Sequence, residues 1–323
     1  MTTQRLHWID WSKALLIYLV VLAHYGNIPP MVDNLICAFH MPAFFMISGY
    51  LHKPIAPSQS VAKNFKRLIV PALLFSLLCW GYYTGLMLIK HTPFSWDEYI
   101  YKPLLGIIRY DRPHVSPPCG VIWFLQVLFI CQVVIDVFVR KGYKTLIALS
   151  LTCIVATAIW YGMGIDDKRN LFFLQRTCAS LPFVILGFMA KEKNWLQRPS
   201  QTYWFPIILA VLYIVGVIYN GRVGIATWRF GHSAVLFFLI ATIGCFSFFL
   251  FVNKTKNGGG KLLITISNGT IVILCLHRLM IPFFMHFHIN AYIGSLLIVA
   301  VCYPLILFFN KYLPWFTGKA QNT

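Results

Sequence analysis

The feature that most constrains this chain is a series of apolar runs, each long enough for a helix to cross a bilayer. A hydrocarbon core of about 30 Å takes about 20 residues of helix. Bounded by charged residues, Pro or Gly, the runs recur near residues 11–28, 32–51, 68–89, 121–139, 145–163, 172–190, 203–220, 231–252, 262–284 and 291–311. This pattern predicts an all-α polytopic membrane protein with about ten transmembrane helices, folded as a single domain over residues 1–323.

The composition excludes several other classes of protein. Hydrophobic residues make up 59% of the 323 residues and charged residues 11%, whereas a soluble domain is about half apolar and a quarter charged. A soluble globule, a disordered chain and a collagen-like fibre are therefore excluded. The first run is flanked by Asp10 and Lys13, and no small-residue cleavage site follows it. We expect it to be a retained span rather than a cleaved signal peptide.

The charge is strongly positive, with 27 Lys and Arg against 9 Asp and Glu. In a soluble protein this excess would suggest nucleic acid. Here the cations lie in short loops between apolar runs, so we predict the lipid bilayer, and not nucleic acid, as their partner. Alternate loops hold 17 and 10 of the 27 cations. The positive-inside rule places the richer side in the cytoplasm together with both termini, which predicts a multi-pass protein of the cytoplasmic (inner) membrane.

Three histidines, His24, His40 and His277, fall inside predicted spans at a similar depth below the outer surface. Lys13 and His24 are eleven residues apart, which is close to three turns and about 16 Å of rise, so they share one face of the first helix. Ionisable groups are costly in hydrocarbon and are functional candidates by default. The ordinary alternative is a hydrogen bond between packed helices, and for His277 taken alone that alternative is preferred.

Imidazole titrates near neutral pH and is the usual proton carrier in acyl transfer to a hydroxyl. The pattern therefore favours His24 as a catalytic base. Zinc fits less well, because no carboxylate lies beside these histidines in the sequence and no HxxxH pair shares a helix. The nine cysteines are scattered and form no CxxC pair, so we expect no metal site and no disulfide framework.

Several segments resemble the integral-membrane acyltransferase family 3, which includes bacterial sugar O-acetyltransferases. The segments with this similarity are Arg5 to Lys13 followed by Val21-Leu22-Ala23-His24, Phe39-His40-Met41-Pro42 continuing to Ser48-Gly49-Tyr50, Lys63 to Pro71, Ile122-Trp123-Phe124-Leu125, and Ile273-Leu274-Cys275-Leu276-His277. They occur in the family's order and span residues 5–277. The chain departs from the family in one segment, where lysines at 63 and 66 with Arg67 stand in place of two arginines three apart.

The resemblance implies a cytoplasmic acyl-CoA donor, usually acetyl-CoA, and an acceptor hydroxyl on a cell-envelope glycan. Lys13, Lys63, Lys66 and Arg67 would then bind the phosphates of acyl-CoA, although positive-inside topology explains each of these cations equally well. We expect Asp10, three residues before Lys13, to pair with it at the edge of the substrate site. His40 would orient the acceptor or stabilise the oxyanion.

On the outer side, we expect Arg109, Trp123 and His277 to contribute to substrate binding, because aromatic faces suit sugar rings and arginine suits anions. The alternative for the aromatics is an interfacial belt, which is preferred for Trp96. Ser48-Gly49 has no base near it in sequence, and small residues within a span usually permit close helix packing. We therefore predict packing rather than a nucleophile there.

Two other functions use the same residues. A proton-coupled transporter or flippase for an anionic solute would need the cations and a histidine relay. Its typical sequence signature, paired discontinuous helices in two related halves, is not evident. A non-catalytic membrane domain that senses a ligand would tolerate loss of His24. The residues favour a membrane-embedded O-acyltransferase over both.

Overall fold

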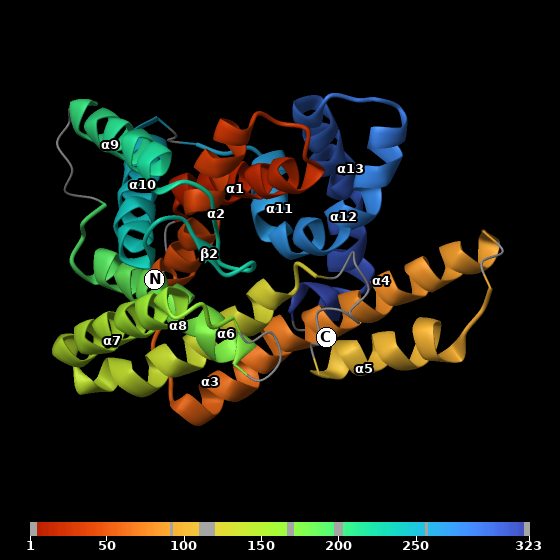
Figure 1. Ribbon diagram of the computed structural model, residues 1–323, viewed down its shortest axis with the longest axis horizontal. Helices are drawn as coiled ribbons and strands as arrows, with labels where there is room; N and C mark the ends of the chain where they lie inside the picture. Colours follow the sequence, from red (N-terminus) through yellow and green to blue (C-terminus); the bar gives the residue numbers. More distant parts are fainter. Residues whose placement is uncertain are drawn as a thin grey trace.

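The computed structural model describes residues 5–90, 93–109, 120–166, 171–196, 203–255 and 258–319, and helices make up almost all of this chain (Figure 1). The longer helices are α1 (His7–Tyr25), α2 (Pro30–Tyr50), α4 (Val70–Ile89), α6 (Trp123–Phe138), α7 (Tyr143–Gly162), α8 (Phe172–Glu192), α9 (Trp204–Asn220), α10 (Ala234–Thr255), α12 (Thr270–His286) and α13 (Ala291–Tyr312). The shorter elements are α3 (Pro57–Asn64), η1 (Phe65–Ile69), η2 (Asp97–Tyr101), α5 (Lys102–Arg109), η4 (Val139–Lys141), β1 (Val223–Gly224), β2 (Arg229–Phe230), α11 (Lys261–Asn268) and η5 (Pro314–Thr317).

The predicted fold class is confirmed, since helices dominate and many of them are long and apolar. Within the described chain, seven helices have the length and composition to cross a membrane, and an eighth follows if the bent pair α11 and α12 is one span. Helix α9 is apolar but has only 17 residues, and α1 carries Asp10 and Lys13 among its apolar residues. Each of the ten predicted runs falls on a helix, while the number of spans, ten, stays a prediction.

Two predicted spans differ from the structure. The run at 68–89 begins earlier, because α3 and η1 continue into α4 as one helix over Pro57–Ile89. The run at 262–284 is not one straight helix: it bends by 79° between α11 and α12. Gly269 occupies the bend, and a Cβ there would lie 2.4 Å from side-chain atoms of Ile306 on α13. Only a residue without a side chain fits so close to α13.

The connection predicted at 90–120 contains regular structure. η2 and α5 run back beside α4 (Figure 1), and the indole nitrogen of Trp80 donates to the carbonyl of Tyr99 at 2.7 Å. Residues 97–109 are thus helical and packed against α4. Trp96, at the start of this helix, is 73% exposed. Residues 91–92 and 110–119 lie outside the described chain.

Helices α2 and α8 cross through a reciprocal pair of glycines. A Cβ at Gly49 would lie 1.9 Å from the carbonyl oxygen of Val184, and a Cβ at Gly187 would lie 1.9 Å from that of Met46. Neither contact is possible for a larger residue, so both glycines are required for the two backbones to touch. The packing role predicted for Gly49 is confirmed, and the crossing fixes the end of α2 that reaches the site.

A fully buried arginine anchors the opposite part of the fold. Arg176 on α8 forms an ion pair with Asp166 at 2.8 Å and donates to the carbonyl of Ala226 at 3.3 Å. Ala226 lies in the turn between β1 and β2, which pair antiparallel with Val223 opposite Phe230. The cation that interrupts the predicted run at 172–190 is therefore satisfied by contacts that hold the β-hairpin against α8.

Candidate functional site

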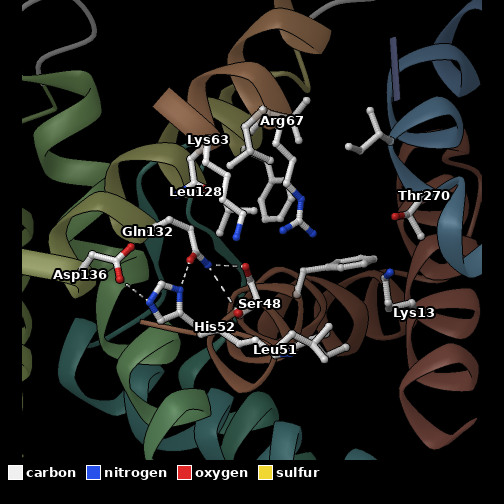
Figure 2. Close-up of a pocket in the computed structure, with 18 of the residues that line it drawn as sticks. Lys13, Ser48, Leu51, His52, Lys63, Arg67, Leu128, Gln132, Asp136 and Thr270 are labelled. Carbon is white, nitrogen blue, oxygen red and sulfur yellow. Dashed lines mark hydrogen bonds and ion pairs between the residues drawn. The ribbon is translucent and has the colours of Figure 1, made fainter. Parts of the chain in front are cut away.

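A cavity of about 310 Å³ opens between α2 and α6 on one side and α1 and α12 on the other (Figure 2). One wall carries Ser48 and Gln132, and the opposite wall carries Lys13 and Thr270. Arg67 extends from η1 into the space between the two walls. The cavity therefore has a mixed lining, with polar groups at well-separated points around an apolar centre.

Cations from three segments converge on this cavity. Lys13, Lys53, Lys63 and Arg67 all line it. Lys63 and Arg67 are about one helical turn apart and share a face of the helix, whereas Lys66 does not line the cavity. Arg67, Arg5 and Lys319 also lie within electrostatic range of Lys13. Burial lowers the pKa of Lys319. Three of the four predicted cations thus line the cavity and Lys53 is an addition, while their binding of phosphates stays a prediction.

A second polar group in the wall was not predicted. Nδ1 of His52 faces Oε1 of Gln132, and Nε2 of His52 faces the carboxylate of Asp136 at 2.9 Å (Figure 2). Gln132 in turn donates to Oγ of Ser48 at 2.7 Å. Both ring nitrogens of His52 therefore lie against oxygen atoms of side chains on α6.

This network orients the hydroxyl of Ser48. Its oxygen accepts from Gln132, which leaves the hydroxyl proton available to an acceptor in the cavity. Ser48 is therefore part of the cavity wall as well as of a packed helix. The signal in the sequence was the spacing of Gln132 and Asp136, two polar residues four apart in an apolar run, which places both on one helix face.

A narrower cavity of about 40 Å³ adjoins the wide one and shares five of its lining residues: Phe44, Phe124, Leu125, Thr270 and Ile271. On α1 the narrow cavity is lined by Ile17 and Val20. With Lys13 and His24 these residues follow the spacing 13, 17, 20 and 24, so they form one helix face. The two cavities together therefore follow α1 from Lys13 to within one turn of His24.

His24 lies in the last turn of α1, and its ring packs edge-on against the ring of His277 with centroids 5.0 Å apart. The predicted convergence of these two histidines is confirmed. In His24, Nδ1 donates to the carbonyl of Val20 at 2.8 Å, and in His277 it donates to that of Ile273 at 2.9 Å. A neutral ring that donates through Nδ1 leaves the lone pair on Nε2.

The Nε2 atoms of His277 and His24 have different surroundings. His277 is fully buried, and its Nε2 has no hydrogen-bond partner among the described residues. His24, in contrast, is an exposed residue. His40 is buried, donates through Nδ1 to the carbonyl of Ile36 at 2.7 Å and lies within electrostatic range of His24. The arrangement offers a base at His24 with a second imidazole against it.

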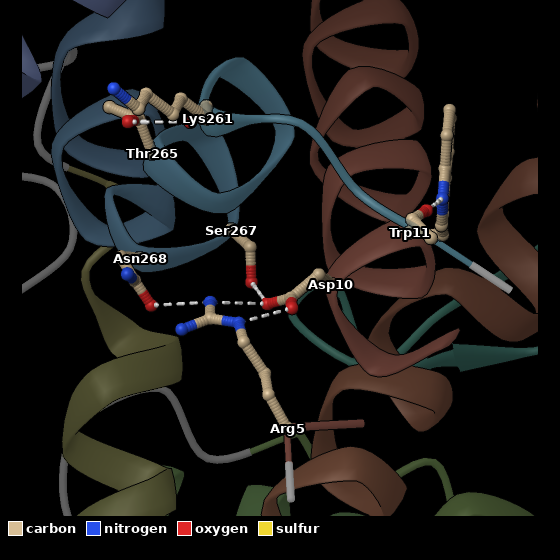
Figure 3. A network of polar contacts seen from close by, with 8 residues as sticks. Arg5, Asp10, Trp11, Lys261, Thr265, Ser267 and Asn268 are labelled. Atoms are coloured by element: carbon tan, nitrogen blue, oxygen red, sulfur yellow. Dashed lines mark hydrogen bonds and ion pairs between the residues drawn. The ribbon is translucent and has the colours of Figure 1, made fainter. Parts of the chain in front are cut away.

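Asp10 is paired differently from the prediction. Its carboxylate accepts two hydrogen bonds from Arg5, at 2.7 and 2.8 Å, and a third from Ser267 at 2.6 Å (Figure 3). The hydrogen bond to Asp10 also raises the pKa of Arg5. The expected ion pair with Lys13 is therefore wrong, because the arginine fork before the helix reaches both carboxylate oxygens. Asp10 joins α1 to α11 and does not line either cavity.

Two of the outer candidates are not placed at a site. Trp123 is 5% exposed and packs its ring near those of Phe45 and Phe124. A buried indole has little surface to offer a sugar, so the acceptor-binding prediction does not fit this residue. The side chain of Arg109, at the end of α5, lies outside the described part of the structure, and its predicted role stays a prediction.

Comparison with known proteins bears on the chemistry. The family model of an acyltransferase domain matches residues 6–313, which covers both cavities and all three histidines. No curated protein and no solved structure matches the chain. Because the match extends over nearly the whole sequence, the resemblance expected from its motifs is confirmed, and the chain belongs to the acyltransferase family 3 of membrane acyltransferases.

Proposed function

We propose that the protein transfers an acyl group, acetyl in the simplest case, from acyl-CoA in the cytoplasm to a hydroxyl of a cell-envelope glycan. The observation that carries this proposal is the pair of adjoining cavities along one face of α1, basic at Lys13 and Arg67 and ending at Val20, about one turn before His24, which itself lines neither cavity. The basic part suits the phosphates of CoA. The narrow cavity would direct the thioester toward His24, which lies about one turn beyond Val20 on the same face of α1 and would act as the base.

The reaction balances with His24 alone as the proton carrier. Nε2 of His24 accepts the proton of the acceptor hydroxyl while the hydroxyl oxygen attacks the thioester carbonyl. The tetrahedral intermediate collapses with cleavage of the carbon–sulfur bond, and the CoA sulfur leaves with the proton that His24 accepted. His277, packed against the His24 ring, holds that ring in place and contacts the acceptor, and His40 positions the acceptor from α2.

The orientation follows from the charges. Arg5, near the start of the chain, and Lys319, near its end, both lie within electrostatic range of Lys13, which supports placing the two termini on the same side as the basic cavity. Positive charge collects on the cytoplasmic side of membrane proteins, where acyl-CoA is made. We place the protein in the cytoplasmic membrane with His24 toward the outer surface.

The test uses membrane vesicles that contain the protein and native envelope glycan, with acetyl-CoA labelled in its acetyl group. We expect label in the glycan with the wild-type protein and none with His24→Ala, although both proteins insert and bind acetyl-CoA. Label in the glycan with His24→Ala would remove the base from the mechanism. Uptake of an anionic solute without acetyl-CoA would favour the alternative function, a transporter. Transporters often contain discontinuous helices, and the helix broken at Gly269 is one such feature here.

A further inference from the structure

The narrow cavity has an apolar wall of its own that the reaction does not otherwise use. Four residues line it without lining the wide cavity: Ile17, Val20, Met41 and Leu274. None of the four carries a hydrogen-bonding side chain except the weakly polar thioether of Met41. A phosphate or an amide would lose its hydrogen bonds there. The wall therefore suits a hydrocarbon group.

Three of these residues, Val20, Met41 and Leu274, lie within four residues of a histidine, each on a different helix. Val20 supplies the carbonyl that accepts from His24, and Leu274 lies three residues, nearly one turn, before His277. Met41 directly follows His40 in the sequence. A donor that enters through the wide cavity thus meets this wall with the last part of its chain, which in an acyl-CoA is the acyl group.

The volume of the narrow cavity is small on the scale of an acyl chain. A cavity needs at least about 10–15 Å³ to hold one water, whose share of liquid volume is about 30 Å³, so the narrow cavity, at about 40 Å³, accommodates only a small group. An acetyl group has three heavy atoms. Each further methylene would have to displace a packed side chain, and Ile17 and Val20 are both at most 1% exposed.

We propose that Ile17, Val20, Met41 and Leu274 set the length of the acyl group, admitting acetyl and excluding longer chains. This inference rests on the proposed function and adds its donor specificity. A pocket that excludes one methylene discriminates by about 10–200-fold. We expect a discrimination of at least tenfold between acetyl-CoA and butyryl-CoA in kcat/KM.

The experiment measures transfer from acetyl-, propionyl- and butyryl-CoA, each labelled in the acyl group, to envelope glycan in the same vesicles. Leu274→Ala enlarges the narrow cavity, and we expect the ratio of butyryl to acetyl transfer to rise about tenfold or more. Leu128→Ala is the matched control, because Leu128 lines the wide cavity but not the narrow one. Its ratio should equal that of the wild type.

Two further variants keep the test decisive. Met41→Ala replaces Leu274→Ala if the latter does not fold, since Met41 is only half-buried. Val20→Leu fills the cavity and should lower transfer of acetyl while leaving binding of acetyl-CoA unchanged. Equal use of acetyl and butyryl donors by the wild-type protein would overturn this inference and leave the acyltransferase proposal standing. Absence of transfer from every donor would overturn both.

Discussion

Helix α1 carries polar side chains at both ends, and the two ends satisfy their hydrogen-bonding atoms in different ways. At the first end, both oxygens of Asp10 accept hydrogen bonds, two from Arg5 and one from Ser267. At the other end, His24 and His277 each use Nδ1 for a carbonyl of their own helix. Nε2 of the buried His277 has no partner among the described residues.

The contrast is between Asp10 and His277 in particular, because Nδ1 of His7 and Oγ of Ser12, at the first end, also lack a partner among the described residues. Buried polar atoms in native proteins almost always have a partner, so an exception calls for an explanation such as catalysis or an absent ligand. The Asp10 network has its partners and joins α1 to α11. Nε2 of His277, whose ring packs against that of His24, has no partner among the described residues. Three predictions sharpen this contrast, and they follow in order of their expected effect on acyl transfer.

The largest effect is expected for His24→Ala. A general base contributes about 10²–10⁴-fold to the rate, and we expect transfer to fall by that factor. The thermal stability should change little, because the imidazole donates only within its own helix and is exposed. The measurements are the rate of glycan labelling and thermal unfolding, followed by the reaction of buried cysteines such as Cys131 and Cys245 with a maleimide.

The matched control for this variant is His286→Ala, which removes an exposed histidine at the end of α12. It should leave both transfer and thermal unfolding unchanged. If His24→Ala lowers the unfolding temperature markedly and transfer is lost with the fold, the histidine end of α1 is structural, and the contrast between the two ends disappears.

Much of the fold was predictable, because hydropathy alone locates helices that must satisfy their backbone hydrogen bonds within a bilayer. The bend at Gly269 was not, since it depends on how closely α13 approaches at Ile306. The start of the third helix at Pro57 was also missed. Its first two turns are polar and lie before the apolar run, so a hydropathy pattern does not include them.

The site was predictable where spacing along one helix defines it. Lys13 and His24 share a face of α1, and the two cavities follow that face. The partners of Asp10 and His52 depend on contacts between segments far apart in the sequence, such as Asp10 with Ser267 and His52 with Asp136. No pattern in a single sequence contains those contacts.

An intermediate effect is expected for Arg67→Gln. The guanidinium lies in the wide cavity, and a hydrogen bond to a charged group contributes about 1.5–3 kcal/mol. We therefore expect KM for acyl-CoA to rise about tenfold or more, with little change in kcat. Lys66→Gln is the control, because Lys66 is next to Arg67 in the sequence but does not line the cavity. An equal rise in KM for both variants would mean that net charge alone attracts the donor.

The smallest effect on transfer is expected for Asp10→Ala. This variant tests most directly whether the first end of α1 contributes to stability rather than to the reaction. The substitution removes three hydrogen bonds and leaves Arg5, whose side chain is 42% exposed, in contact with water. We expect transfer to stay within about threefold of the wild type, since Asp10 lines neither cavity. The free energy of unfolding should fall by about 1.5–3 kcal/mol, the usual contribution of a charge-assisted hydrogen bond.

Glu98→Ala provides the comparison for stability, because Glu98 forms an exposed ion pair with Lys102. Exposed pairs contribute about 0–1 kcal/mol, so this variant should unfold nearly as the wild type does. If Asp10→Ala instead abolishes transfer while the protein remains as stable as the wild type, the carboxylate takes part in the reaction. The Asp10 carboxylate, whose oxygens both have hydrogen-bond partners, would then be as functional as His277, whose Nε2 has none among the described residues. The presence of hydrogen-bond partners would not distinguish a structural group from a reactive one.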